Sequence, residues 1–215
     1  ASLTSTLSEG VGIEGKNSVT LTDCDLTADN TQRNGHAKFL DSIMIYQSMS
    51  GDADSGTSAF TMTGGSLISK SGHVFHVTNT HAVITLNNVT VENQDSGNVF
   101  LSVCADGWDG SSNIAELLCR NQTIEGSVLV GSDSYLTLTL NDASRFSGCI
   151  SGEIADSSGE SVSTKEGSVS VILDESSVWE LSADSYITEF SGNAAQIISN
   201  GYTLYVNGTG LSGTK

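Results

Sequence analysis

The sequence predicts an all-β chain folded as a right-handed parallel β-helix, a solenoid of about seven or eight rungs. A segment of alternating apolar and polar residues, best seen in Ala82–Val91, recurs along the 215 residues, and period two is typical of strands. The recurrences return in phase with one another, as stacked structural repeats do. The chain has no proline, and this phase disfavours the alternative, an antiparallel sandwich with short hairpins.

The anchor residues of the repeat are expected to form one interior column. They are Leu21, Met62, Leu86, Cys119, Leu140, Leu181 and Val206. Apolar residues follow most anchors by five positions, or by six once, at Leu26, Leu67, Val91, Ile124, Phe146, Tyr186 and Leu211. Apolar doublets precede most anchors at Ile43/Ile45, Phe75/Val77, Leu101/Val103, Val128/Val130 and Val169/Val171. Each rung therefore has at least two short strands joined by Gly, Asn, Ser or Asp corners.

Composition excludes some partners. The chain carries 25 acidic and 8 basic residues, a net charge of −17, which argues against nucleic acid and anionic lipid. No run approaches the ~20 apolar residues of a membrane span, so no membrane insertion is expected. The acidity serves solubility or cation binding. One solenoid domain accounts for residues 1–215, and without a signal peptide at Ala1 the chain is mature, trimmed or a fragment.

Four cysteines are present, at Cys24, Cys104, Cys119 and Cys149. They form no CxxC pair and have no histidine at metal spacing, so zinc is not expected. Buried reduced cysteines are the default interpretation. A disulfide involving Cys104 or Cys149 stays open for an exported protein.

Two acidic excursions predict a candidate site. Gly51–Thr57 and Asp106–Ser112 both interrupt the chain between the first and second strand of a rung, so they should leave one corner two rungs, or roughly 10 Å, apart. The candidate Ca²⁺ ligands are Asp52, Asp54, Asp106 and Asp109. Trp108 beside them is a candidate for sugar stacking. The competing interpretation is solvated turns that use Asp and Gly for their backbone habits.

Two further segments are polar and irregular. Asp29–Lys38 is expected to loop out of the stack, and Glu153–Glu166 is expected as a third excursion, placed after the second strand of its rung.

An outward row of hydroxyls and amides is the second candidate site. Its residues are Thr20/Thr22, Thr61/Thr63, Thr85/Asn87, Thr139/Asn141 and Tyr205/Asn207. Stacked in register, the threonines Thr20, Thr22, Thr61, Thr63 and Thr85 could match a crystalline polysaccharide or an ice lattice. Threonine is also an ordinary residue on a solvated strand face. Leu118/Arg120 and Glu180/Ser182 interrupt the regularity, which counts against ice binding.

No catalytic residues are predicted. The four histidines, at His36, His73, His76 and His81, form no recognised signature. Asp23 and Asp25 are a close carboxylate pair without a matching acid in the next rungs. No GxSxG elbow is present, although a Ser–His–Asp arrangement built in three dimensions stays open. A polysaccharide lyase-like enzyme is therefore the less favoured hypothesis.

The segments Phe60–Gly72, His81–Val91, Ser134–Ile150, Val178–Gly192 and Asn200–Gly208 resemble secreted right-handed β-helix proteins of Gram-positive bacteria. These proteins have the pectin-lyase-like fold and are described as adhesin-like or carbohydrate-binding. The resemblance covers nearly the whole chain, and its motifs are structural. It implies a secreted or cell-surface location and carries over no catalytic residues.

These observations favour a non-catalytic extracellular protein that binds a polysaccharide or a host or cell-surface ligand, with Ca²⁺ as a candidate cofactor. The alternative is a structural subunit that assembles end to end with copies of itself into filaments, because unpaired strand edges associate readily.

Overall fold

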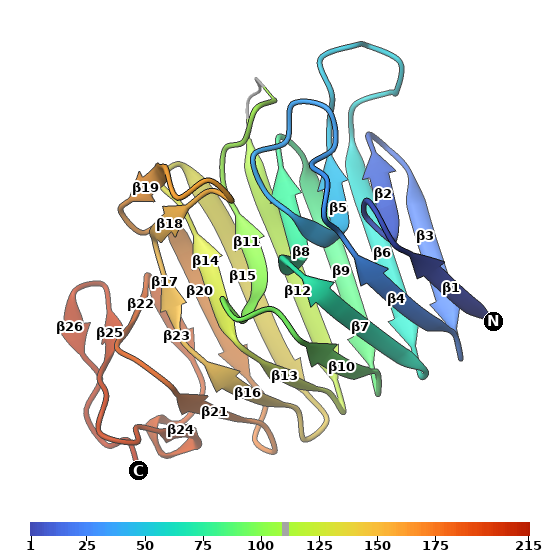
Figure 1. The fold of residues 1–215 in the computed structure, drawn as a ribbon. Helices are drawn as coiled ribbons and strands as arrows, with labels where there is room; N and C mark the ends of the chain where they lie inside the picture. The colour runs from blue at the N-terminus through green and yellow to red at the C-terminus, as the bar shows by residue number, and fades with distance from the viewer. Residues whose placement is uncertain (109–111) are drawn as a thin grey trace.

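The computed structural model describes residues 1–108 and 112–215, and nearly all of its regular structure is parallel β-sheet (Figure 1). Two large sheets run along the molecule. Sheet B contains β2 (Val11–Glu14), β5 (Asp41–Tyr46), β8 (His73–Thr78), β11 (Val99–Val103), β14 (Ser127–Val130) and β17 (Ile150–Ser151). Sheet C contains β3 (Ser18–Thr22), β6 (Thr57–Thr63), β9 (His81–Asn87), β12 (Asn113–Arg120), β15 (Ser134–Asn141), β20 (Ser168–Leu173) and β23 (Glu189–Ser191).

Two smaller parallel sheets complete the long walls of the molecule. Sheet A contains β1 (Ser2–Ser5), β4 (Asp25–Asp29), β7 (Ser66–Ser71) and β10 (Thr90–Asn93). Sheet D contains β13 (Thr123–Glu125), β16 (Arg145–Gly148), β21 (Val178–Leu181) and β24 (Ile197–Ile198). From β2 to β16 the chain visits sheet B, then sheet C, then sheet A or D, and repeats that order. This recurrence is consistent with a β-solenoid.

Six short elements, in three groups, depart from that order. An antiparallel hairpin joins β18 (Glu153–Ala155) to β19 (Ser161–Thr164). Near the C-terminus, β22 (Ser185–Ile187), β25 (Leu204–Val206) and β26 (Thr209–Gly210) form their own sheet. The 3-10 helix η1 spans Ala194–Gln196, and Asn193 caps it.

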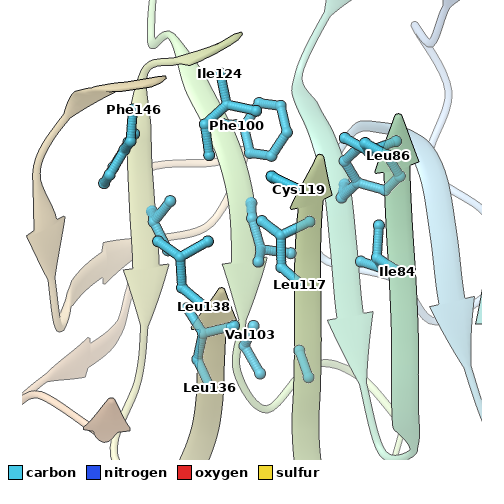
Figure 2. Packing of buried hydrophobic residues seen from close by; sticks show 14 of the residues in the cluster. Ile84, Leu86, Phe100, Val103, Leu117, Cys119, Ile124, Leu136, Leu138 and Phe146 are labelled. Atoms are coloured by element: carbon cyan, nitrogen blue, oxygen red, sulfur yellow. The ribbon is translucent and has the colours of Figure 1, made fainter. Parts of the chain in front are cut away.

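The predicted interior column is confirmed over its first five anchors. Each anchor pairs in register with the next, in the order Leu21, Met62, Leu86, Cys119 and Leu140. A second column two residues earlier runs through Phe60, Ile84, Leu117 and Leu138. Figure 2 shows Ile84, Leu86, Leu117, Cys119 and Leu138 of these columns within one shared core. Each fully buried Leu, Ile or Phe contributes roughly 1.5–3 kcal/mol of hydrophobic stabilisation.

The last two anchors were predicted wrongly. Leu140 pairs with Leu173, so Leu173 continues the column. Leu181 pairs instead with Gly148 in sheet D, and Val206 pairs with Ile187 beside β22. The apolar residues five positions after these two anchors are also misplaced. Tyr186 is exposed, and Leu211 packs only partly against the core.

The cause of that error is the shortness of β17. It has two residues, too few to display alternation, so the doublet Val169/Val171 resembled a first strand. The doublet belongs to β20 of sheet C, where Val171 pairs with Leu138. The same slip placed the Glu153–Glu166 excursion after a second strand. The hairpin in fact leaves between β17 and β20, the same B-to-C corner as the other two excursions.

The opposite corner is tight and uses residues that tolerate positive φ. Asp23, Asn88, Asn121 and Asp142 follow strands of sheet C with φ between 45° and 58°. Asn and Asp adopt this conformation at lower cost than other side chains. Gly65 has φ 74°, and a Cβ there would lie 1.9 Å from the carbonyl oxygen of Cys24. The four cysteines are free, and Cys104 and Cys119 are buried.

Candidate functional site

The outer face of sheet C carries the predicted hydroxyl rows. Thr20 pairs with Thr61 and Thr61 with Thr85, while Thr22 pairs with Thr63 and Thr63 with Asn87. A third row lies beside them at Ser18, Ala59 and Val83. We call these nine positions of β3, β6 and β9 the threonine patch. Every position is exposed or partly exposed, and none carries a charge.

The rest of the same face has a different character. In β12, Glu116, Leu118 and Arg120 occupy the positions in register with Val83, Thr85 and Asn87, which confirms the predicted interruption at Leu118/Arg120. Arg120 lies 3.7 Å from Asp142, and His81 lies 2.8 Å from Glu116. The predicted interruption at Glu180/Ser182 and the terminal pair Tyr205/Asn207 do not belong to this face, because Glu180 lies in sheet D and Tyr205 in β25.

The outer face of sheet B, in contrast, is covered. Residues 30–40 and the β18–β19 hairpin meet over it: Leu40 N–H donates to Ser157 Oγ at 2.9 Å, and Ser157 N–H donates to the Lys38 carbonyl at 3.1 Å. Phe39, Cys104 and Ile154 form a second small apolar cluster there. The residues beneath this cover are consequently removed from water although they project from the outside of a sheet.

A hydrogen-bonded chain of side chains lies under the cover. His73 Nδ1 and His76 Nδ1 each lie 2.7 Å from Ser102 Oγ, and His76 Nε2 lies 3.0 Å from Asp106 Oδ2. Asp106 Oδ1 also accepts from the backbone N–H of Lys38 at 2.6 Å and from that of Gly107. One consistent proton arrangement is His73 N–H to Ser102 Oγ, Ser102 O–H to His76 Nδ1, and His76 N–H to Asp106.

Burial and hydrogen bonding set the protonation states of this cluster. Desolvation, followed by the neighbouring His76, lowers the pKa of His73 to about 3, so His73 is neutral near pH 7. Burial alone would raise the pKa of Asp106, but hydrogen bonds and charge from His76, with the two backbone N–H groups, hold it below its usual value. Burial, with Glu9 and Asp106 nearby, raises the pKa of Asp41 well above its usual range.

Ser102, His76 and Asp106 have the connectivity of an acyl-transfer triad, the arrangement that the sequence left open. The Ser102 hydroxyl is already shared by two imidazoles, and the side chains of His76 and Asp106 have 0% exposure. Ser102 is also 0% exposed. A nucleophile needs space for a reacting atom, and the folded form leaves none exposed at Ser102. The cluster instead contacts the cover, because Asp106 accepts a hydrogen bond from the backbone N–H of Lys38. Sequence reasoning missed it because its members come from β8, β11 and a loop, and no spacing motif joins them.

The predicted calcium corner is only partly visible. Asp52 and Asp54 are exposed, Asp106 is committed to His76, and Asp109 lies outside the described residues. In the described part of the chain, no three His, Cys, Asp or Glu side chains gather in an arrangement that could hold a metal ion. Calcium binding at this corner therefore stays a prediction.

Trp108, the candidate for sugar stacking, packs against two other aromatic side chains, and sugar stacking by its ring stays a prediction. Its ring centroid lies 5.1 Å from that of Tyr46 and 5.5 Å from that of His36, which meets it edge-on. Its indole Nε1 is buried and finds no hydrogen-bond partner among residues 1–108 and 112–215. Trp108 thus packs beneath the cover of sheet B, away from the threonine patch.

No family model, curated protein or solved structure matches the chain. Within the described residues, no helix is both long and apolar enough to cross a membrane.

Proposed function

We propose that this chain is a right-handed parallel β-helix of seven or eight rungs that acts outside the cell, without catalysis, by binding a polysaccharide through the threonine patch. The seven strands of sheet C supply the rung estimate. The right hand follows from the strong preference of parallel crossovers for that hand. The secreted, adhesin-like character comes from the resemblance described above.

One observation carries the binding proposal: a solvent-facing patch without a charged side chain on a protein of net charge −17. Adjacent strands place equivalent side chains ~4.8 Å apart, so the threonine hydroxyls form straight rows parallel to the stacking direction. A neutral glycan can exchange hydrogen bonds with these hydroxyls and lay its C–H surfaces on their methyl groups. No charged side chain within the patch has to be desolvated on binding.

Binding of the intact chain to insoluble cellulose and chitin and to soluble pectate and alginate tests this proposal, with Ca²⁺ and with EDTA. Thr61→Glu introduces a charge at the centre of the patch and should weaken binding about tenfold or more. Thr139→Glu is the matched control, because Thr139 occupies the same row outside the patch, between Leu118 and Ile172. That variant should bind within about twofold of the parent.

Two outcomes would overturn the proposal: no binding to any of the four glycans with or without Ca²⁺, or equal losses in the two variants. Loss of binding in EDTA alone would support Ca²⁺ as a cofactor at the Asp52 and Asp54 corner.

End-to-end assembly into filaments is the second candidate. It is favoured by the edges of β2 and β3, which end their sheets, and by the incomplete burial of Val19 and Leu21. Electron micrographs of the purified chain separate the two functions, since monodisperse particles at high concentration would reject assembly.

A further inference from the structure

We propose that Tyr186 and Tyr205, at the C-terminal end of the molecule, form a binding site for an amino sugar that carries a free ammonium group. Tyr186 lies in β22 and Tyr205 in β25, and the two residues pair in register. Their ring centroids are 5.1 Å apart and the rings are parallel within 6°. This site is separate from the threonine patch and does not depend on it.

The two rings project away from the core. Ser185 and Ile187, which flank Tyr186, are buried, as is Leu204 beside Tyr205, whereas Tyr186 is 38% exposed. An aromatic pair that served only packing would gain most by full burial, because each aromatic side chain buries 150–250 Å² when covered. The exposure leaves aromatic surface available to a ligand.

The third strand of this sheet places a glycine beside the stack, where an added Cβ would lie 3.3 Å from the methyl group of Thr203. In β26 the residue paired with Tyr205 is Gly210, which has no side chain. The face of the Tyr205 ring that is turned away from Tyr186 therefore has no side chain from the paired position over it. Adjacent strands lie ~4.8 Å apart, close to the spacing of the two tyrosine rings. A pyranose ring over Gly210 would continue the stack by placing its C–H groups on the ring face of Tyr205.

The charge around the pair selects the class of sugar. The pKa of Tyr186 is raised by partial burial, then by Asp184, by Tyr205, and by Glu166 and Glu153. Three carboxylates thus act on a ring that is itself attractive to cations. A glucosamine unit meets both requirements, with a flat apolar ring face and an ammonium group. An N-acetylated unit keeps only the stacking, and a uronic acid is repelled.

The experiment titrates the intact chain with four tetramers, of glucosamine, N-acetylglucosamine, galacturonate and lysine, followed by tyrosine NMR signals and calorimetry. The glucosamine tetramer should bind at least about fivefold more tightly than the N-acetylated one and lose affinity as salt is added. Galacturonate should not bind. Tetralysine should bind more weakly than glucosamine because it lacks the flat ring.

Three variants locate the site. Tyr205→Leu removes the ring and Gly210→Leu fills the space beside it, and each should weaken glucosamine binding about tenfold. Tyr135→Leu is the control, since Tyr135 is 51% exposed on β15 of sheet C and is not part of the Tyr186–Tyr205 stack. Urea midpoints equal to the parent's confirm that the variants fold.

The proposal is overturned if the parent does not bind the glucosamine tetramer, if tetralysine binds as tightly, or if neither Tyr205→Leu nor Gly210→Leu weakens binding. Thr61→Glu should leave this binding unchanged, so failure here is distinguishable from failure of the threonine patch.

Discussion

Sheets B and C are built from the same kind of strand, yet their outer faces have opposite fates. On sheet C the outward side chains of β3, β6 and β9 meet solvent. On sheet B the outward Met44, His76 and Ser102 are fully buried. The strands do not cause this difference. It comes from the connections, since residues 30–40, residues 104–108 and the β18–β19 hairpin fold back over sheet B.

Covering a sheet face changes what its side chains must do. Buried polar groups need partners, and under the cover His73, His76, Ser102 and Asp106 supply them to one another. The buried Asp41 carboxylate has no hydrogen-bond partner within the described part of the chain, and its raised pKa keeps it neutral over a wider pH range. On the bare face the hydroxyls are exposed or partly exposed to solvent, so they do not need partners within the protein.

The largest expected effect is on the covered face. Asp106→Ala removes the acceptor for His76 Nε2–H and for the backbone N–H groups of Lys38 and Gly107. Leaving buried donors without a charged acceptor should lower the free energy of unfolding by about 3 kcal/mol. Urea denaturation measures this loss. The control Asp52→Ala, at an exposed position, should stay within about 0.5 kcal/mol of the parent; equal losses would mean that the cover does not depend on Asp106.

The second expected effect is a loss of stability at low pH that arises on the covered face. The pKa of His73 is lowered from 6.5 to about 3 in the folded chain, so the unfolded chain binds the proton first. The stabilising contribution is complete above pH 6.5 and is lost as the pH falls towards 3. Between pH 7.5 and pH 5 the unfolding free energy of the parent should fall by about 2 kcal/mol more than that of His73→Gln.

Other titratable groups lie around His73, so its contribution is obtained by comparing the parent with the variant. His76 lowers the pKa of His73 further, while Asp95 and Asp106 raise it. Asp41 titrates in the opposite sense and is common to both proteins, so the difference between parent and variant isolates His73. Hydrogen exchange should show the extra opening in β8 and residues 30–40. His81→Gln, at a partly exposed histidine, is the control and should keep the parent's pH response; a loss of that response as large as in His73→Gln would contradict this account.

Much of the fold could be predicted from the sequence because alternation and phase are local signals. Leu21 to Leu140 form the expected column, and Leu26, Leu67 and Val91 pair as expected in sheet A. Prediction failed after Cys149, where the two-residue β17 gave no periodicity and the hairpin added its own strands. A repeat that is identified by its spacing can no longer be followed where a strand is too short to show alternation.

The sites were harder to predict for a related reason. The threonine rows repeat with the strands, so their register followed from the anchors. The Ser102 cluster and the Tyr186–Tyr205 stack depend on which residues the insertions and the last turn bring together, and no sequence spacing encodes that. Asp106 shows the limit well, because its sequence context suggested a metal ligand whereas its carboxylate accepts hydrogen bonds from His76 and two backbone groups.

The smallest expected effect tests whether the side chains of the bare face contribute to the stability of the fold. Thr61→Val keeps the β-branched shape and removes one partly exposed hydroxyl, so its unfolding free energy should change by less than about 0.5 kcal/mol. Ser102→Ala also removes one hydroxyl, but leaves two imidazoles without their shared partner and should cost about 1–3 kcal/mol. Thermal and urea unfolding of both variants measure the two losses of unfolding free energy, which can then be compared. If Thr61→Val cost as much as Ser102→Ala, the threonine row would be part of the scaffold, and its neutrality would no longer indicate a surface kept for a ligand.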